Sequence, residues 1–171
     1  MKRLLIVVDY QNDFVDGALG FEGADRLYPF ILEKIEEYRK DDTVVFTRDT
    51  HFDNYLNTEE GRNLPIPHCI KNTKGWRFYK ALEEISKDFL VFEKSTFGSY
   101  KLFDYLRKNE FDEIELVGLV SSICVISNAI IAKTALPNAH VIVNRLGTSS
   151  FDKDVHEKSL EVMKNLHVEI R

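Results

Sequence analysis

The chain has 171 residues, 44% of them hydrophobic, which suits a single α/β domain spanning residues 1–171. Its formal net charge of -5 argues against nucleic acid or an anionic membrane as a partner. No apolar run has the length of a membrane span, and the first residues lack the features of a secretory signal peptide. With only two cysteines, Cys69 and Cys124, we expect a reduced, cytoplasmic setting.

Apolar runs rich in β-branched and aromatic residues alternate with segments of helical period along the chain. Buried strands are predicted at 4–8, 43–47, 89–92, 114–117 and 141–143, with a short closing strand at 167–170. Helices are predicted at 27–38, 76–85, 126–136 and 155–166, and another helix follows Ser99 as its cap. No period holds between 48 and 75, where histidine, aspartate and aromatic residues indicate a functional loop.

This alternation predicts the fold class. We expect a doubly wound, mostly parallel six-stranded sheet with helices on both faces, a Rossmann-like α/β architecture. Such sheets bind ligands beyond the carboxyl ends of their strands. Asp9, Asp49, Lys94 and the 118–124 turn all fall at or just past predicted strand ends.

The 118–124 turn places a thiol in the first turn of a helix. Gly118 and two serines separate the fourth predicted strand from Cys124. Free backbone N–H groups and the positive end of the helix dipole favour thiolate over thiol there. Taken alone, Cys124 is more often a small buried hydrophobic residue, so a catalytic role requires a base nearby.

Two more reactive side chains are predicted at the same edge of the sheet. Asp9 ends the first strand and Lys94 follows the third. Singly, Asp9 would be a turn or helix-cap residue and Lys94 a solvated lysine. Together beside Cys124, the aspartate can accept the thiol proton, and the lysine can hold the aspartate and stabilise the thiolate.

The loop after the second strand carries a candidate metal site. Asp49 and His51 point the same way in extended chain, and His68 follows later in the loop. Two imidazoles and a carboxylate suit zinc, iron or manganese. Alternatively, both histidines are hydrogen-bonding surface residues. Cys69 is interpreted as structural. No role is assigned to His140, His156 or His167.

Several motifs, in order along nearly the whole chain, match those of one known family. They are Asp9-x-Gln11-x-Asp13-Phe14, Thr47-Arg48-Asp49-x-His51, Pro67-His68-Cys69, Lys94 in a Lys-Ser-x-Phe setting, and Gly118-x-x-Ser121-x-x-Cys124-Val125. The chain resembles the isochorismatase-like cysteine hydrolases, whose best-known members are nicotinamidases. The resemblance implies the isochorismatase-like hydrolase fold.

The resemblance also implies roles for individual residues. The implied catalytic triad is Asp9, Lys94 and Cys124. The implied ligands of a divalent metal, zinc first and iron or manganese as alternatives, are Asp49, His51 and His68. The family has a non-proline cis peptide before the nucleophile turn, here between Leu119 and Val120. It would aim the Val120 and Cys124 N–H groups at one point, as an oxyanion hole.

The substrate pocket follows the family less closely. Phe14 is kept as a pocket residue. Thr50 and Pro65 stand where nicotinamidases commonly carry tryptophan, and the second of those tryptophans is a wall of the pyridine pocket. Trp76 is the predicted substitute for that wall. Ser122 replaces a common aspartate near the nucleophile.

These observations predict an amidohydrolase of a small, nicotinamide-type carboxamide that acts through a thioester at Cys124. Two alternatives stay open: a hydrolase of another small amide or ureido compound with the same triad, and a non-catalytic metal-binding member of the fold. Isochorismate cleavage is disfavoured because that family branch does not use the cysteine. The expected partner is a small-molecule substrate, and formation of a homo-oligomer stays open.

Overall fold

The computed structural model describes residues 1–171 and contains one six-stranded sheet. The strands are β1 (Arg3–Val8), β2 (Thr43–Asp49), β3 (Leu90–Lys94), β4 (Glu113–Leu119), β5 (His140–Ser149) and β6 (Glu169–Ile170). Their order is β3-β2-β1-β4-β5-β6 and every pairing is parallel, which confirms the predicted fold class.

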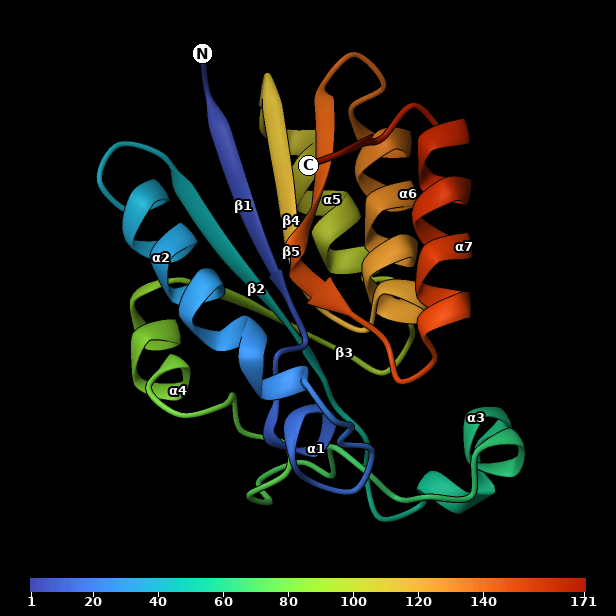
Figure 1. Ribbon diagram of the computed structural model, residues 1–171. Coiled ribbons are helices and arrows are strands. Elements are labelled where there is room, and N and C mark those ends of the chain that lie inside the picture. The colour runs from blue at the N-terminus through green and yellow to red at the C-terminus, as the bar shows by residue number, and fades with distance from the viewer.

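Helices cover both faces of this sheet (Figure 1). They are α1 (Asn12–Val15), α2 (Tyr28–Tyr38), α3 (Glu59–Asn63), α4 (Leu82–Ile85), α5 (Tyr100–Lys108), α6 (Ile126–Ala135) and α7 (Lys153–Asn165). One apolar layer lies between the sheet and α5, α6 and α7, and the other lies under α2 and α4. The central strands contribute side chains to both layers, which explains why residues 4–8 are all apolar.

Local sequence signals account for several helix boundaries. The Ser99 hydroxyl accepts a hydrogen bond from the Leu102 N–H at 3.1 Å, so the predicted cap of α5 is confirmed. The helix predicted at 76–85 is largely wrong, because only α4 is helical there. Phe78 instead pairs with Gln11 in an antiparallel bridge, and Lys80 has a positive φ of 50°.

The carboxyl ends of the strands gather at the lower end of the sheet in Figure 1, and the segment carrying α3 extends away from the body beside them. The chain order of the strands reverses between β1 and β4, so a crevice forms at this edge. The protein has no helix whose length and apolar character would let it cross a membrane.

Candidate active site

The structure brings the three predicted triad residues together at the crevice. Asp9 directly follows β1, Lys94 ends β3, and Cys124 lies in the turn after β4; all three are buried. The Lys94 Nζ lies 2.6 Å from Asp9 Oδ2 and 3.6 Å from Cys124 Sγ. It also donates a hydrogen bond to the Thr96 carbonyl at 2.9 Å. One ammonium therefore joins the aspartate and the thiol.

Burial controls the protonation of this cluster. It raises the pKa of the Asp9 carboxyl, against the opposing attraction of Lys94. Burial also raises the pKa of the Cys124 thiol well above its ordinary value, although Lys94 opposes the shift. Burial disfavours the charged form of Lys94, but the facing Asp9 carboxylate outweighs it and raises the lysine pKa. The resting cluster is therefore an aspartate–lysine pair beside a neutral thiol.

This protonation differs from the thiolate expected from the helix position alone. Cys124 is only 5% exposed, so a thiolate would lose its solvation. Residues Ser121–Val125 form a π-helical turn before α6. A buried thiol with an aspartate for a neighbour loses its proton to that base during a reaction rather than beforehand.

The turn that carries Cys124 starts where the neighbouring parallel strands β1 and β4 approach each other closely, at Val8 and Gly118. Gly118 has a φ of 117°, and a Cβ there would lie 2.0 Å from the Val8 carbonyl oxygen, so only glycine fits. The peptide bond between Leu119 and Val120 is cis, as the family resemblance implies. The Val120 N–H makes no hydrogen bond within the chain. This amide is thus free to donate to a ligand in the crevice.

Next to the triad, the predicted metal ligands form a compact, buried group. The ligand atoms of Asp49, His51 and His68 all lie within 4.8 Å of one another. His51 Nε2 is 3.0 Å from Asp49 Oδ2, and His68 Nε2 is 3.5 Å from the same oxygen. The His68 Nδ1 donates to the Ile66 carbonyl at 2.8 Å, so in the neutral imidazole the Nε2 that faces the group is the nitrogen available as a ligand. This donor set fits a divalent ion such as zinc.

One carboxylate of this group is absent from the sequence-based prediction. The Glu60 Oε1 on α3 lies 3.6 Å from the Nε2 atoms of both His51 and His68. Burial raises the pKa of Glu60, although the two histidines oppose the shift. No spacing rule pointed to Glu60, because the irregular loop had no predictable path.

The loop after β1 holds the two segments that carry the metal ligands. The fully buried Gln11 side chain accepts a hydrogen bond from the Asp49 N–H at 2.7 Å and donates to the Asp49 carbonyl at 2.9 Å. The Asp13 carboxylate accepts from the Cys69 N–H at 2.7 Å, beside His68. Gln11 and Asp13 therefore hold the candidate ligand segments in place, which explains their position in the motif with Asp9.

The triad and the metal ligands meet at a cavity of about 830 Å³. Its inner lining includes Cys124, Val120, Asp49, His51 and His68. Half of the remaining lining residues are apolar or aromatic; they are Phe14, Leu19, Phe52, Tyr55, Leu64, Phe97 and Ile123. The structure thus places Phe14 in this cavity, where its ring packs edge-on against His68 with the centroids 5.6 Å apart.

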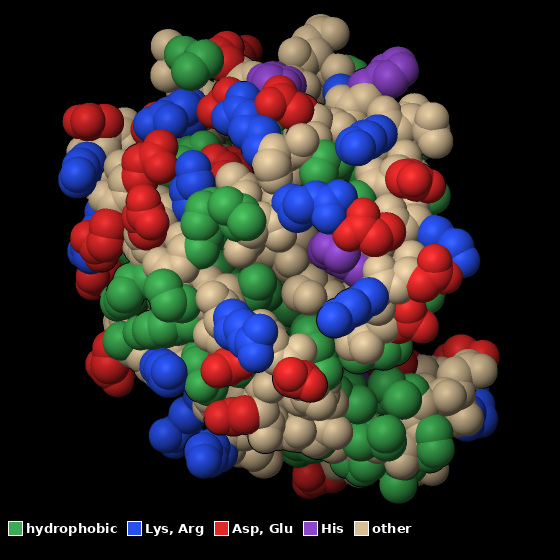
Figure 2. All heavy atoms as spheres, viewed as in Figure 1, with side chains coloured by type: hydrophobic (Ala, Val, Ile, Leu, Met, Phe, Trp, Pro, Cys, Tyr) green, Lys and Arg blue, Asp and Glu red, His purple; other side chains and the backbone are tan.

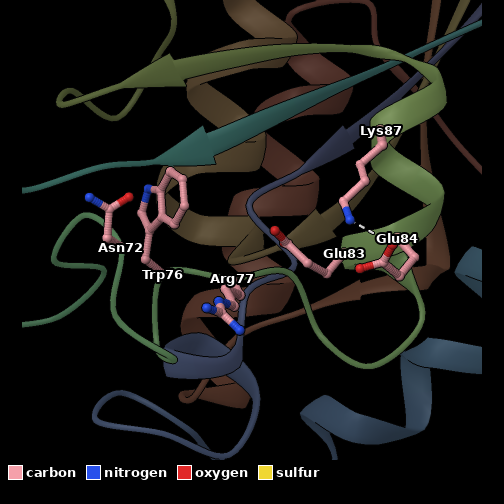
Figure 3. A pocket seen from close by; sticks show the side chains of 6 residues that line it. All are labelled: Asn72, Trp76, Arg77, Glu83, Glu84 and Lys87. Carbon is pink, nitrogen blue, oxygen red and sulfur yellow. Dashed lines mark hydrogen bonds and ion pairs between the residues drawn. The ribbon is translucent and has the colours of Figure 1, made fainter.

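Trp76 lies outside this cavity, in contrast to the expectation that its ring replaces a pocket wall. Its indole N–H donates to the Thr50 hydroxyl at 2.9 Å, and the Arg48 guanidinium stacks 4.2 Å from the ring centre. Figure 3 shows Trp76 beside β2. The residue lines a separate, mostly polar cavity, whose volume is about 340 Å³. Thr50 and Arg48 hold the ring on that side of the strand end, away from Cys124.

The two serines before Cys124 also have partners that the sequence did not indicate. The Ser122 hydroxyl lies 2.9 Å from that of Ser150. The buried Ser121 hydroxyl lies 2.7 Å from Nδ1 of His156 on α7, a histidine assigned no role above. Side-chain contacts therefore join the turn that carries Cys124 to α7 and to the segment between β5 and α7.

Comparisons with known proteins show the family of the chain. The isochorismatase domain family matches residues 3–171. The nicotinamidase/pyrazinamidase of Mycobacterium tuberculosis is 28% identical over 183 aligned residues, covering 98% of this chain and 97% of that protein. An isochorismatase family protein of Bacillus subtilis is 30% identical over 181 residues, covering 96% of each chain.

Solved structures show the same fold. The crystal structure of a nicotinamidase/pyrazinamidase from Bacillus subtilis superimposes with a TM-score of 0.89 at 27% identity, over 99% of each chain. The pyrazinamidase of Pyrococcus horikoshii in complex with zinc has a TM-score of 0.87 at 29% identity, over 100% of this chain and 99% of that one. The chain belongs to the isochorismatase domain family, in its nicotinamidase-related branch.

Proposed function

We propose that this protein is a cysteine-dependent amidohydrolase that converts a small, nicotinamide-type carboxamide to the carboxylate and ammonia. Family membership supports a hydrolase acting on amide C–N bonds. The single observation that supports the cysteine mechanism is the buried Lys94 ammonium, 2.6 Å from the Asp9 carboxylate and 3.6 Å from Cys124 Sγ. A thiol with an adjacent base, which is itself oriented by a third group, is the arrangement that nucleophilic catalysis needs.

In the acylation step, Cys124 Sγ forms a bond to the amide carbonyl carbon while Asp9 accepts the thiol proton. The backbone amides of Val120 and Cys124 donate to the developing oxyanion, and one such donor contributes roughly 3–4 kcal/mol to the transition state. The C–N bond then breaks, Asp9 returns its proton to the leaving nitrogen, and ammonia departs. A thioester on Cys124 remains.

In deacylation Asp9 again acts first as a base and then as an acid. A water oxygen bonds to the thioester carbon while Asp9 accepts the water proton. The C–S bond breaks, the carboxylic acid leaves, and the sulfur takes the proton back from Asp9. Lys94 stays charged throughout, because its pKa is raised, and so keeps Asp9 oriented for both steps.

The proposed metal ligands are Asp49, His51 and His68, and zinc is the proposed ion. The zinc complex of the Pyrococcus horikoshii pyrazinamidase and the compact donor set support this choice. When bound, the ion supplies a Lewis acid at the cavity wall that can hold a ring nitrogen of the substrate. Asp49 also lies 3.5 Å from Lys94 Nζ, so it contacts both the metal site and the triad.

Ammonia release across a panel of nicotinamide, pyrazinamide, biuret and ureidoacrylate tests the proposal and separates the family branches. We expect turnover of a carboxamide by the zinc-loaded protein and none by Cys124→Ala. Cys69→Ala is the matched control, because it removes the other thiol, which lies outside the cavity, and should retain turnover. Acid quenching should give the mass of an acyl group on Cys124. Turnover by Cys124→Ala would rule out the thioester.

A further inference from the structure

The cavity continues well beyond the reacting atoms. At about 830 Å³ it lies in the upper part of the ~300–1,000 Å³ range of pockets that hold drug-sized ligands. Cys124 and the metal ligands occupy only its inner wall. A single pyridine ring with one carboxamide group, placed against Cys124, would leave the outer part of the cavity unfilled.

The outer part has an apolar rim that nothing in the chain covers. The rings of Phe52 and Phe97 line the cavity yet are 55% and 50% exposed. They come from different segments, one after β2 and the other after β3. Figure 2 shows hydrophobic side chains gathered at the lower right, beside the segment that carries α3. An apolar group of a bound ligand would remove these rings from water.

The charges of the wall restrict what that group can be. The lining residues include the carboxylates of Asp49, Glu59 and Glu60, but no lysine or arginine. Lys94 is paired with Asp9 behind the wall. A carboxylate on the substrate would find no free cation in the lining, because the neighbouring Arg62 is already paired with Glu59 at 2.8 Å, and it would face the Glu60 carboxylate beside the histidines.

We propose that the outer part is a second subsite for an uncharged, apolar group carried by the substrate. The substrate is then a neutral carboxamide larger than one pyridine ring. This inference rests on the proposed amidohydrolase function and narrows it, because it excludes amide and ureido compounds that carry a carboxylate. Phe97 and Phe52 are the residues that set the preference.

Two probes test the proposed preference of the subsite for an apolar group. They are nicotinamide, and nicotinamide with a phenyl group on the ring carbon meta to the amide. We expect a kcat/KM at least about tenfold higher for the phenyl compound. Phe97→Ala should lower the ratio of the two kcat/KM values at least about fivefold. The matched control is Leu146→Ala, a leucine that is 67% exposed outside the cavity, and it should leave the ratio unchanged.

The proposed exclusion of anionic substrates is tested with the analogue in which a carboxylate replaces the phenyl group. We expect its kcat/KM to fall at least about tenfold below that of nicotinamide. Glu59→Lys should raise the ratio of carboxylate analogue to nicotinamide about threefold, and added salt should weaken this gain. Glu161→Lys makes the same charge change on α7, outside the cavity, and should leave the ratio unchanged.

The outcomes separate the two proposals. If no amide is hydrolysed, the amidohydrolase function and the subsite both fail. If nicotinamide is hydrolysed at least as efficiently as the phenyl compound, or if Phe97→Ala leaves their ratio intact, the subsite alone is refuted. Efficient hydrolysis of the carboxylate analogue would overturn the exclusion of anions.

Discussion

Lys94 is only 3% exposed and yet remains charged, whereas most charged lysines lie in contact with solvent. Its ammonium is compensated by Asp9 at 2.6 Å and by the Thr96 carbonyl at 2.9 Å. A buried charge is tolerated only with such partners. The Asp9 carboxylate has in addition the Thr47 hydroxyl, which donates to it at 2.7 Å. Ionising Cys124 as well would add a second buried anion, so the neutral thiol is the stable resting form.

The rate of alkylation of Cys124 by iodoacetamide should therefore keep rising with pH in the ligand-free protein. Burial raises the thiol pKa, so the reactive thiolate accumulates only above the free-thiol value of ~8.5. Mass spectrometry of the Cys69→Ala variant, from about pH 6 to about pH 10, isolates the reaction at Cys124. A plateau at or below neutral pH would show a preformed thiolate instead.

At the residue scale, sequence predicts positions better than side-chain directions. Because parallel strand ends converge at one edge, the sequence predicts that Asp9, Lys94 and Cys124 lie close together, and the structure has them within contact of one another. Trp76 was misplaced, because its direction depends on its contacts with Thr50 and Arg48, which lie far away in sequence. Glu60 was missed for the same reason, since its approach to the histidines depends on the fold of an irregular loop.

Among the elements, the β1–β4 contact depends most directly on a single residue. Gly118→Ala should destabilise the protein by at least about 2 kcal/mol, because the new Cβ meets the Val8 backbone and φ is positive. Gly23→Ala is the matched control: its φ is 89°, but a Cβ there meets nothing within 4 Å. The Gly23→Ala substitution should lower the free energy of unfolding only by the ~1–2 kcal/mol of the backbone strain. Urea unfolding measures the loss of stability in both variants. Equal losses would show that the contact between Gly118 and the Val8 backbone adds nothing to the strain.

The loop after β1 holds the segments of the proposed metal ligands, so a change there should weaken metal binding. Gln11→Leu removes the hydrogen bonds to both backbone groups of Asp49. We expect zinc affinity, measured by competition with a chromogenic chelator, to fall about 10–100-fold. Asn12→Ala, which removes a hydrogen bond to the exposed Lys74 carbonyl from the same loop, is the control. Equal zinc affinity in the Gln11→Leu and parent proteins would exclude this positioning role.

Element prediction succeeded where the pattern reflects burial. The runs at 4–8 and 114–117 became the central strands β1 and β4, because both faces of each are covered. The predicted helix at 76–85 failed because tertiary pairing overrode local propensity. Its first half is held against Gln11 through Phe78.

On the scale of the whole molecule, one sheet shared by two apolar layers predicts a single cooperative unfolding transition for residues 1–171. Zinc at about 100 times its Kd should add about 2.7 kcal/mol and raise the Tm, because it binds only the folded site. His51→Ala should lose this shift. Calorimetry measures both, and two separate transitions would mean that the layers unfold independently.

The position of Trp76 has a practical consequence for such experiments. It is the chain's only tryptophan, and its indole is hydrogen-bonded to Thr50, between the metal-site residues Asp49 and His51, yet it lies outside the substrate cavity. Its fluorescence therefore serves as a native optical reporter of the end of β2. Metal loading should alter that emission, whereas a ligand that occupies only the cavity cannot quench the indole by direct contact. A fluorescence titration can thus follow metal binding without an attached dye and without direct quenching by a ligand in the cavity.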